Sequence, residues 1–490
     1  MGILRRLFGA KQQAAPLTPR MIRAFYDAAR NTPESYKHWA NADAMSADAA
    51  QQPAVRRTLR MRSRYEVANN SYARGIVLTL ANDVIGTGPR LQSLLGDGED
   101  DNSINGVVEK AFTAWARAVD LGAKLRTMRM ARAQDGEAFA ILTTNPKLAS
   151  PVKLDLRLIE ADQVATPNLF LPTPQQVDGI VFDSYGNPIT YHVLRMHPGA
   201  MLSTGQMLFD PYPAESVLHW YRVDRPGQSR GLPDIMPALP LFAQLRRFTL
   251  AVLGAAEIAA DQALVMKTTT PAGEAAAEVP NGAVMDFERN MAVFAPEGWE
   301  PYQIKAEQPA TTYAMFKREI LGEIARCLNL PFNVAACDSS SYNFASGQLD
   351  HQTYYRSLRV DQTHCEAVIL DRILDAWMAE AATVYPELNG IEELPHQWMW
   401  DGRDVGNPID LANAASTRLS SNTTTLSAEY AKQGKDWETE LRQRAKEVAL
   451  AKELGLTQAQ TMPTVAQPEE APPVPRNEEK PNAAKQKNAA

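Results

Sequence analysis

Cysteine is scarce in this sequence of 490 residues, which contains only Cys327, Cys337 and Cys365. Three cysteines cannot build a disulfide framework, so we expect a protein made in a reducing compartment. Long apolar runs are also missing: no stretch approaches the ~20 residues of a membrane span, and no apolar segment follows the first arginines as in a secretory signal. The sequence predicts a soluble, intracellular protein, and its length allows about three domains.

Motifs of several enzyme classes are missing as well. The sequence has no Gly-x-x-x-x-Gly-Lys run to cradle phosphates, and neither a His-Glu-x-x-His nor a Cys-x-x-Cys pair to bind zinc. Asp135 and Glu137 flank Gly136, and we expect a turn before a strand rather than a pair of catalytic carboxylates. His364 and Cys365 are adjacent on a predicted helix and point about 100° apart, which disfavours a shared metal. We therefore predict no catalytic residue, no cofactor and no metal.

One segment resembles a nucleophile site more than any other. Cys337 is followed by Asp338 and Ser339, and His351 and His364 lie further along the chain. A hydrolase needs an imidazole within hydrogen-bond reach of its thiol or hydroxyl group. Such neighbours are common by chance, so an enzyme that processes nucleic acid with Cys337 and His364 is a minor alternative.

Charge is unevenly distributed along the chain. The net charge of −7 excludes a uniformly basic nucleic-acid coat, yet residues 1–74 carry 13 Lys and Arg against five Asp and Glu. The segment includes five closely spaced arginines: Arg56, Arg57, Arg60, Arg62 and Arg64. Two explanations have equal weight: a solvated helix, or a contact with nucleic acid or an acidic partner. Residues 458–490 hold six prolines and no aromatic residue, which predicts a disordered tail.

Apolar periodicity and turn residues predict an α+β protein in which helices precede and follow a sheet-rich region. Residues from about 19 to 80 are helical and end in a turn at 82–89, and an amphipathic helix covers 105–119. Strands are expected further on: 139–142, 154–159, 177–182, 189–194 and 216–223. Residues 183–188 join two of these strands as a hairpin.

Two helices with a proline-rich insert between them come next. Small residues on the first helix, 237–266, predict close packing between copies of the same helix: Ala255, Ala259 and Ala263. The insert, 267–309, has five prolines and is expected to contain β-structure. On the second helix, 311–329, an apolar face is separate from a charged stripe of Glu319, Glu323 and Arg326. A polar loop at 332–346, a long helix at 348–385 and a last helix at 427–454 complete the prediction.

Several segments, in order, resemble the lambda family of bacteriophage portal proteins. The most specific runs from His219 to Pro233, contains Arg-Pro-Gly-Gln-Ser-Arg-Gly, and stands immediately before the first long helix. Similar segments lie on both sides of it: Arg60–Arg64, Asn69–Ala73, Asn82–Gly88, Asp135–Phe139, Leu158–Asp162, Gly179–Tyr191, Leu328–Phe332 and Tyr342–Ser346. The chain lacks the Arg that the family often has after the last of these. The order and spacing of the segments, over about residues 20–455, carry the resemblance.

The resemblance implies a portal fold with an α/β wing, a two-helix stem, a small β-containing clip and a helical crown. It divides the chain in order: a flexible basic N-terminus at 1–20, the wing at 21–232, the first stem helix at 233–266, the clip at 267–309, the second stem helix at 310–330, a channel loop at 331–347, a long helix returning to the wing at 348–420, the crown at 421–457 and the tail at 458–490.

The resemblance also implies a function. About twelve copies would form a ring at one vertex of the capsid, and double-stranded DNA would pass through it without sequence recognition during packaging and ejection. Expected partners are the terminase large subunit on the clip, the major capsid or scaffold protein, and a head–tail adaptor, with no membrane. The protein would be a non-enzyme of the virion, assembled in the host cytoplasm. A non-viral oligomeric scaffold or adaptor is the other alternative.

A DNA conduit must not hold its cargo, because each contact between a lysine and a phosphate strengthens binding and makes release more costly. We therefore expect the channel lining at the charged stripe and the polar loop: Glu319, Glu323, Arg326, Ser339, Ser340, Ser341 and Asn343. An equal alternative places Glu319 and Glu323 at a subunit interface, paired with Lys or Arg of the next copy.

Overall fold

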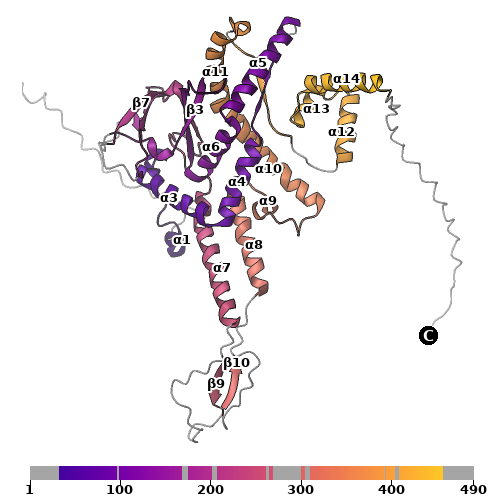
Figure 1. The fold of residues 1–490 in the computed structure, drawn as a ribbon. Coiled ribbons are helices and arrows are strands. Elements are labelled where there is room, and N and C mark those ends of the chain that lie inside the picture. Colours follow the sequence, from indigo (N-terminus) through magenta and orange to yellow (C-terminus); the bar gives the residue numbers. More distant parts are fainter. Residues whose placement is uncertain are drawn as a thin grey trace, which may run out of the picture. The chain divides into compact units, whose positions relative to one another are not determined.

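The computed structural model describes residues 32–95, 99–167, 175–200, 207–260, 264–268, 299–303, 310–391, 393–402 and 408–455. The predicted flexible N-terminus and disordered tail lie outside these residues. The chain divides into two units, residues 1–410 and 411–490, each described here by itself. The larger unit combines helices with antiparallel sheets (Figure 1), which confirms the predicted α+β class. No helix of the described part is long and apolar enough to cross a bilayer.

The basic segment at the start forms four helices where one helical stretch is predicted: α1 (Pro33–His38), α2 (Ala47–Ala50), α3 (Pro53–Asn69) and α4 (Ser71–Ile85). Asn70 separates α3 from α4, because its side-chain oxygen accepts hydrogen bonds from the N–H groups of Tyr72 and Ala73, at 3.0 and 3.4 Å. This N-cap interaction begins a new helix. Gly86, with a φ of 59°, ends α4 at the predicted turn.

Two further helices precede the sheets, α5 (Glu99–Ala118) and α6 (Leu121–Asp135). Helix α5 covers the predicted helix at 105–119. The sequence does not predict α6, because Arg129 and Arg132 occupy buried positions where apolar residues are the usual signal. Asp120, with a left-handed φ of 53°, turns the chain between the two helices.

Within the described residues, strands β2 to β8 pair in two antiparallel sheets, in the orders β3–β2–β8 and β4–β5–β6–β7. Their bounds are β2 (Glu137–Thr144), β3 (Leu154–Ile159), β4 (Gln176–Val177), β5 (Ile180–Phe182), β6 (Pro188–Leu194), β7 (Phe209–Pro213) and β8 (Val217–Tyr221). The predicted hairpin joins β5 to β6, and the Asp183 carboxylate accepts hydrogen bonds from the N–H groups of Tyr185 and Asn187, both at 2.8 Å. Short 3-10 turns connect some elements: Ala161–Gln163, Ala214–Ser216, Met236–Ala238 and Pro386–Leu388.

Strand β2 lies between two hydrophobic clusters. Successive residues of a strand point to opposite faces of the sheet. Ala138 and Ala140 belong to the main core, whereas Phe139 and Ile141 belong to a smaller cluster with residues of β6 and β8. The main core contains three fully buried tryptophans: Trp115, Trp220 and Trp377.

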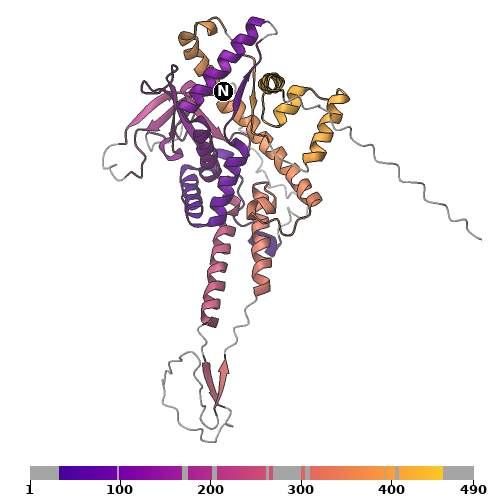
Figure 2. The ribbon, with the colours of Figure 1, turned by 45° about the vertical axis from the view of Figure 1, so that its right-hand side comes forward.

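After β8 the chain forms α7 (Leu239–Ala260), β9 (Leu264–Thr268), β10 (Trp299–Gln303) and α8 (Ala310–Cys327). The helix predicted at 237–266 starts before α7 and extends past its end at Ala260. Its last predicted residues belong instead to β9, since residues 264–268 pair with 299–303 as an antiparallel two-stranded sheet. The prediction of β-structure in the insert is confirmed. Figures 1 and 2 show α7 and α8 side by side, where Phe248 packs on Tyr313 and Phe316, with ring centroids 5.7 and 4.4 Å apart.

The chain then returns to the main core through α9 (Phe332–Ala336), α10 (Phe344–Cys365), a π-helical turn (Glu366–Leu370) and α11 (Asp371–Val384). The predicted long helix at 348–385 is thus nearly continuous, although it starts four residues earlier. Strand β11 (His396–Met399) follows and pairs with β1 (Arg90–Ser93). The indole N–H of Trp398 donates a hydrogen bond to Asp371, at 2.8 Å, which fixes this connector against α11.

The smaller unit is helical, with α12 (Pro408–Ser420) entering it and α13 (Leu426–Lys432) and α14 (Trp437–Glu453) within it. The single last helix predicted at 427–454 is wrong, because Gly434 takes a φ of 70° and divides it. Helix α14 has no buried residue, and its exposed side chains include Val448 and Leu450.

A close approach of two backbone segments requires glycine at 231, and this generates our first prediction. A Cβ atom on Gly231 would lie 2.0 Å from the carbonyl oxygen of Gly136. We expect Gly231→Ala to lower the free energy of unfolding by about 1–3 kcal/mol. Gly75→Ala is the matched control, because nothing lies within 4 Å of its Cβ position in α4, and it should raise stability by about 0.5–1 kcal/mol. Urea unfolding measures both, and equal stability of the two variants would contradict the packing described.

Candidate channel surface and its buried support

The charged stripe predicted on the second helix lies on the exposed side of α8. Glu319, Glu323 and Arg326 are all exposed, and none of them forms an ion pair with another described residue. The residues between them are buried: Ile320, Leu321, Ile324 and Ala325. The helix therefore presents an uncompensated charged face to its surroundings and an apolar face to the rest of the unit.

The polar loop is shorter than predicted. Residues 332–336 form α9, and α10 begins at Phe344, so the irregular segment is 337–343 rather than 331–347. Local capping explains both boundaries, because the Asn343 side chain accepts a hydrogen bond from the N–H of Ser346, at 2.8 Å, and Cys337 ends α9 with a left-handed φ of 52°. The predicted channel residues Ser339, Ser340, Ser341 and Asn343 are all exposed on this segment.

The segment is held at both ends by side-chain hydrogen bonds. His351 of α10 lies 3.0 Å from the Asn333 side chain of α9 and 3.1 Å from the Tyr355 hydroxyl. The Tyr354 hydroxyl donates to Asp83 at the end of α4, at 2.6 Å. Helices α9 and α10 are thus joined to each other and to α4, which fixes where residues 337–343 project.

Of the alanines predicted to pack between copies, only Ala255 has a described side chain. Ala255 is exposed on α7, whereas the side chain of Ala259 and all of Ala263 lie outside the described residues. The same helix exposes larger apolar side chains, with 59% of Leu250 and 54% of Leu253 accessible. Met315 of α8 is 68% exposed.

The carboxylate of Glu137, at the start of β2, is fully buried. Arg230 binds it through two parallel hydrogen bonds, at 2.6 and 2.8 Å. The N–H of Gly231 donates to it at 3.1 Å, and His219 lies at the same distance. Such bidentate, charge-assisted contacts are the strongest hydrogen bonds a protein makes. They fix the loop between β8 and α7, which is the segment that most resembles the portal family.

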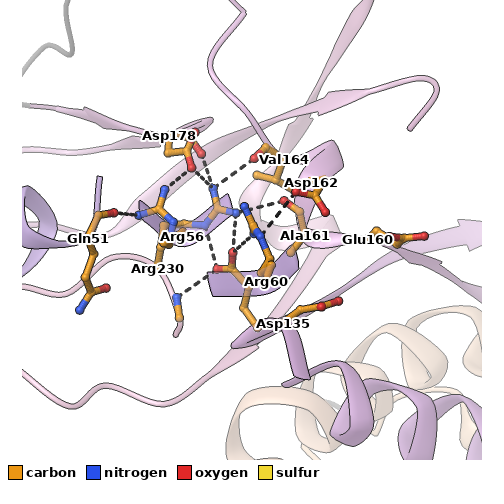
Figure 3. A network of polar contacts seen from close by, with 12 residues as sticks. Gln51, Arg56, Arg60, Asp135, Glu160, Ala161, Asp162, Val164, Asp178 and Arg230 are labelled. Carbon is orange, nitrogen blue, oxygen red and sulfur yellow. Dashed lines mark hydrogen bonds and ion pairs between the residues drawn. The ribbon is translucent and has the colours of Figure 1, made fainter. Parts of the chain in front are cut away.

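Three arginines of the basic run also point inward, as Figure 3 shows for Arg56 and Arg60 beside Arg230. Arg56 pairs with Asp178, Arg60 lies 3.2 Å from Glu137, and Arg64 binds Asp135 at 2.7 Å. These three arginines lie four residues apart, on one face of the helix. The interpretation of the run as a solvated or nucleic-acid-binding surface is therefore wrong for these positions. Arg57 and Arg62 remain exposed.

The charges of this network shift the titration of its members. Burial by itself raises the pKa of Glu137, but the charge of Arg230 and the hydrogen bonds from His219 and Arg230 outweigh it and hold the pKa well below its usual range. Burial lowers the pKa of His219 despite the neighbouring Glu137. The carboxylate is thus ionised and the imidazole neutral at pH 7.

A second network connects the segment before α7 and the C-terminal part of α10 to α6. Arg129 binds Asp234, which lies before α7, at 3.1 Å, and Asp361 of α10 at 3.0 Å. Arg132 also binds Asp361, at 3.0 Å. Helix α6 therefore orients both α7 and α10, and the sequence shows no local signal of this role because the partners lie over 100 residues away.

The residues weighed for catalysis do not assemble into a site within the described part of the chain. The Cys337 thiol contacts the Val334 carbonyl at 4.0 Å, and no hydrogen bond of the described residues joins it to His351 or His364. The predicted turn at Gly136 is confirmed, with a φ of 93°. At this turn Asp135 pairs with Arg64 and Glu137 pairs with Arg230. These ion pairs balance the two carboxylate charges and do not prepare them for proton transfer.

Residues 227–231 read Gly-Gln-Ser-Arg-Gly and match the Gly-x-Ser-x-Gly pattern of serine hydrolases. The geometry does not support that role. The Ser229 hydroxyl donates a hydrogen bond to Asp48, at 2.8 Å, and Arg230 is part of the buried network. The segment is a loop between β8 and α7, without the sharp strand-to-helix turn that exposes a nucleophile.

Among the described residues, Glu160, Asp162 and His197 form a cluster whose ligand atoms lie within 4.8 Å of one another. A guanidinium group already occupies its acidic side, because Arg64 binds Asp162 at 2.7 Å and Glu160 at 3.3 Å. The cluster is thus an extension of the ion network rather than a cation site.

Comparison with known proteins agrees with the resemblance to phage portal proteins. A family model described as phage portal protein, lambda family, matches residues 33–362. A protein of Halomonas phage phiHAP-1 that is named a probable portal protein is 24% identical over 437 residues, which cover 81% of each chain.

Two solved structures were also compared with this chain. A chain from the neck of an empty gene transfer agent particle is 12% identical, with 76% of this chain and 92% of that chain covered and a TM-score of 0.43. An HK97 family phage portal protein from Corynebacterium diphtheriae is 13% identical, with 74% and 97% covered and a TM-score of 0.27.

The buried carboxylate generates the second prediction. We expect Glu137→Gln to lower the free energy of unfolding by about 3–5 kcal/mol, because it removes the closer of the two carboxylates that pair with the buried Arg230 and leaves only Asp178, at 3.2 Å. Glu387→Gln, at an exposed position, is the control and should change stability by less than about 0.5 kcal/mol. Urea unfolding at neutral pH measures both.

The same variant has a defined pH dependence. The depressed pKa of Glu137 means that its stabilisation is fully present above the ordinary carboxyl value of 4.5 and is lost as the pH falls towards the folded-state pKa. The stability difference between the native protein and Glu137→Gln should therefore be constant from about pH 7 to 5 and shrink near pH 3. A difference that stays unchanged down to that pH would show that the charge of Glu137 is not what stabilises the loop.

Proposed function

The chain belongs to the lambda family of phage portal proteins, and from this premise we propose that its copies form a ring of about twelve at one capsid vertex. The ring is a channel for double-stranded DNA, which enters during packaging and leaves during ejection. The observation that carries this proposal is the family match over residues 33–362. The protein acts in the virion, after assembly in the host cytoplasm.

Exposed apolar side chains on the helix pair support assembly into a ring. Leu250, Leu253 and Met315 expose more than half of their surface, and such side chains on neighbouring helices mark a surface that another protein covers. In a closed ring each copy uses two different faces. We propose that α7 and α8 form the stem, and that Ala255, Ala259 and Ala263 pack against the adjacent copy.

The charged stripe and the polar segment suit a channel wall. Glu319, Glu323 and Arg326 combine to a small negative charge, and the exposed side chains at 339–343 include three serines and one asparagine. Neither surface offers the cationic excess that binds DNA phosphates. We infer that both line the channel, where DNA slides past without being held.

The other elements then take their places. Residues 21–232 form the wing, the β9–β10 sheet belongs to the clip, and α13 and α14 belong to the crown. The sequence has no phosphate-cradling motif, so a separate motor must do the packaging work. We propose that the terminase large subunit docks on the clip, that a head–tail adaptor also binds the ring, and that the wing contacts the major capsid or scaffold protein.

The mass of the assembled protein is the third prediction and tests the proposal directly. Native mass spectrometry of the purified full-length chain should give a single closed species of about twelve copies. A monomer or dimer at micromolar concentration would favour the non-viral adaptor instead. Cys337→Ala should leave this mass and DNA packaging unchanged, whereas loss of activity in that variant would revive the enzyme alternative.

Charge reversal on α8 is the fourth prediction. Glu319→Lys with Glu323→Lys gives each copy two new cations on the proposed wall, so DNA exit from assembled particles should slow by about tenfold at low salt and recover as salt rises. The neutral pair Glu319→Gln with Glu323→Gln is the control and should change the exit rate little. If the reversed variant fails to form rings while the neutral one does, the two residues belong to a subunit interface instead.

A further inference from the structure

A cavity of about 330 Å³ lies beside the turn at 86–88, between β1 and the helices α5 and α6. Its wall contains three arginines from three different elements, Arg90, Arg117 and Arg126. Apolar carbon completes the wall, including Pro89 and Ala116. A concave site of this size with a few polar groups is typical of a binding pocket.

The guanidinium groups of this cavity are poorly compensated. Arg117 is exposed and has no ion-pair partner among the described residues. Arg126 donates a hydrogen bond to the carbonyl oxygen of Gly86, at 2.7 Å, and so satisfies one donor without neutralising its charge. Arg90 lies 3.7 Å from Asp401, and both side chains are partly exposed. Elsewhere in the unit, the buried arginines all bind carboxylates.

Asp120 is the single carboxylate in the described cavity wall. Its side chain makes no capping hydrogen bond to α6, and no acidic residue stands in the first turn of that helix. The start of α6 therefore adds the partial positive charge of its dipole to that of the arginines. The cavity as a whole favours an anionic group.

We propose that this cavity is a docking site for an acidic segment of a partner protein, in which a carboxylate pairs with Arg117 and Arg126 beside an apolar side chain. The shape favours a peptide over DNA, because phosphates on a duplex meet protruding cations, whereas these arginines line a hollow. The apolar wall also has no role in phosphate binding. Bidentate pairing of guanidinium with carboxylate supplies both affinity and orientation.

The test uses the assembled full-length protein and a fluorescein-labelled peptide of alternating Glu and Leu. We expect Arg117→Glu to weaken peptide binding, measured by fluorescence anisotropy, by at least about tenfold. Arg74→Glu is the control, since Arg74 is exposed at the other end of α4, and it should change binding by less than about twofold. Arg90→Glu provides a second variant in the same cavity and should also weaken binding.

Three outcomes would overturn the proposal. Equal binding by the native protein and both cavity variants would show that the peptide binds elsewhere. Stronger binding of a labelled duplex DNA than of the peptide, lost in Arg117→Glu, would assign the cavity to nucleic acid. Full competition by inorganic phosphate at concentrations equal to the peptide would show a site for a small anion only. None of these outcomes bears on ring formation, which the mass measurement tests separately.

Discussion

The burial of one carboxylate constrains much of this molecule. Glu137 has no contact with solvent, and an ionised group in that position is stable only if its lone pairs are bound by opposite charge and donors. Arg230, Gly231 and His219 supply those partners from a single stretch of chain. The loop before α7 must therefore close on the start of β2, and this contact sets where the long helix begins.

A second set of ion pairs extends the constraint to α6 and α10. Arg129 binds Asp234, just before α7, and Asp361, within α10. Because α6 carries this arginine, one helix holds both the segment before α7 and the C-terminal part of α10. The proposed channel surface is thereby supported by ion pairs that are not part of it. The arginine-lined cavity lies at the opposite end of the same helix, where Arg117 has no ion-pair partner among the described residues and Arg90 lies 3.7 Å from Asp401.

Local patterns predict much of this fold, and long-range pairing accounts for what they miss. The hairpin at 183–188, the helix over 311–329 and the insert with β-structure follow from turn residues and apolar spacing. Helix α6 and the inward stripe of Arg56, Arg60 and Arg64 do not, because charged residues normally indicate a solvated face and their partners are remote in sequence. The resemblance identifies His219–Pro233 as the most specific segment, and in the structure its residues Arg230 and Gly231 bind Glu137. The proposed channel residues belong to a charged stripe and a polar loop in the sequence, and all of them are exposed in the structure.

The central claim is that copies of this chain enclose a passage whose wall is built by α8 and residues 337–343. A cryo-electron microscopy reconstruction of the purified assembly tests it most directly. The account predicts a closed ring in which Glu319, Glu323 and the serines at 339–341 border the central opening. A ring whose opening is bordered by α7 or by the wing, with α8 enclosed between subunits, would contradict it.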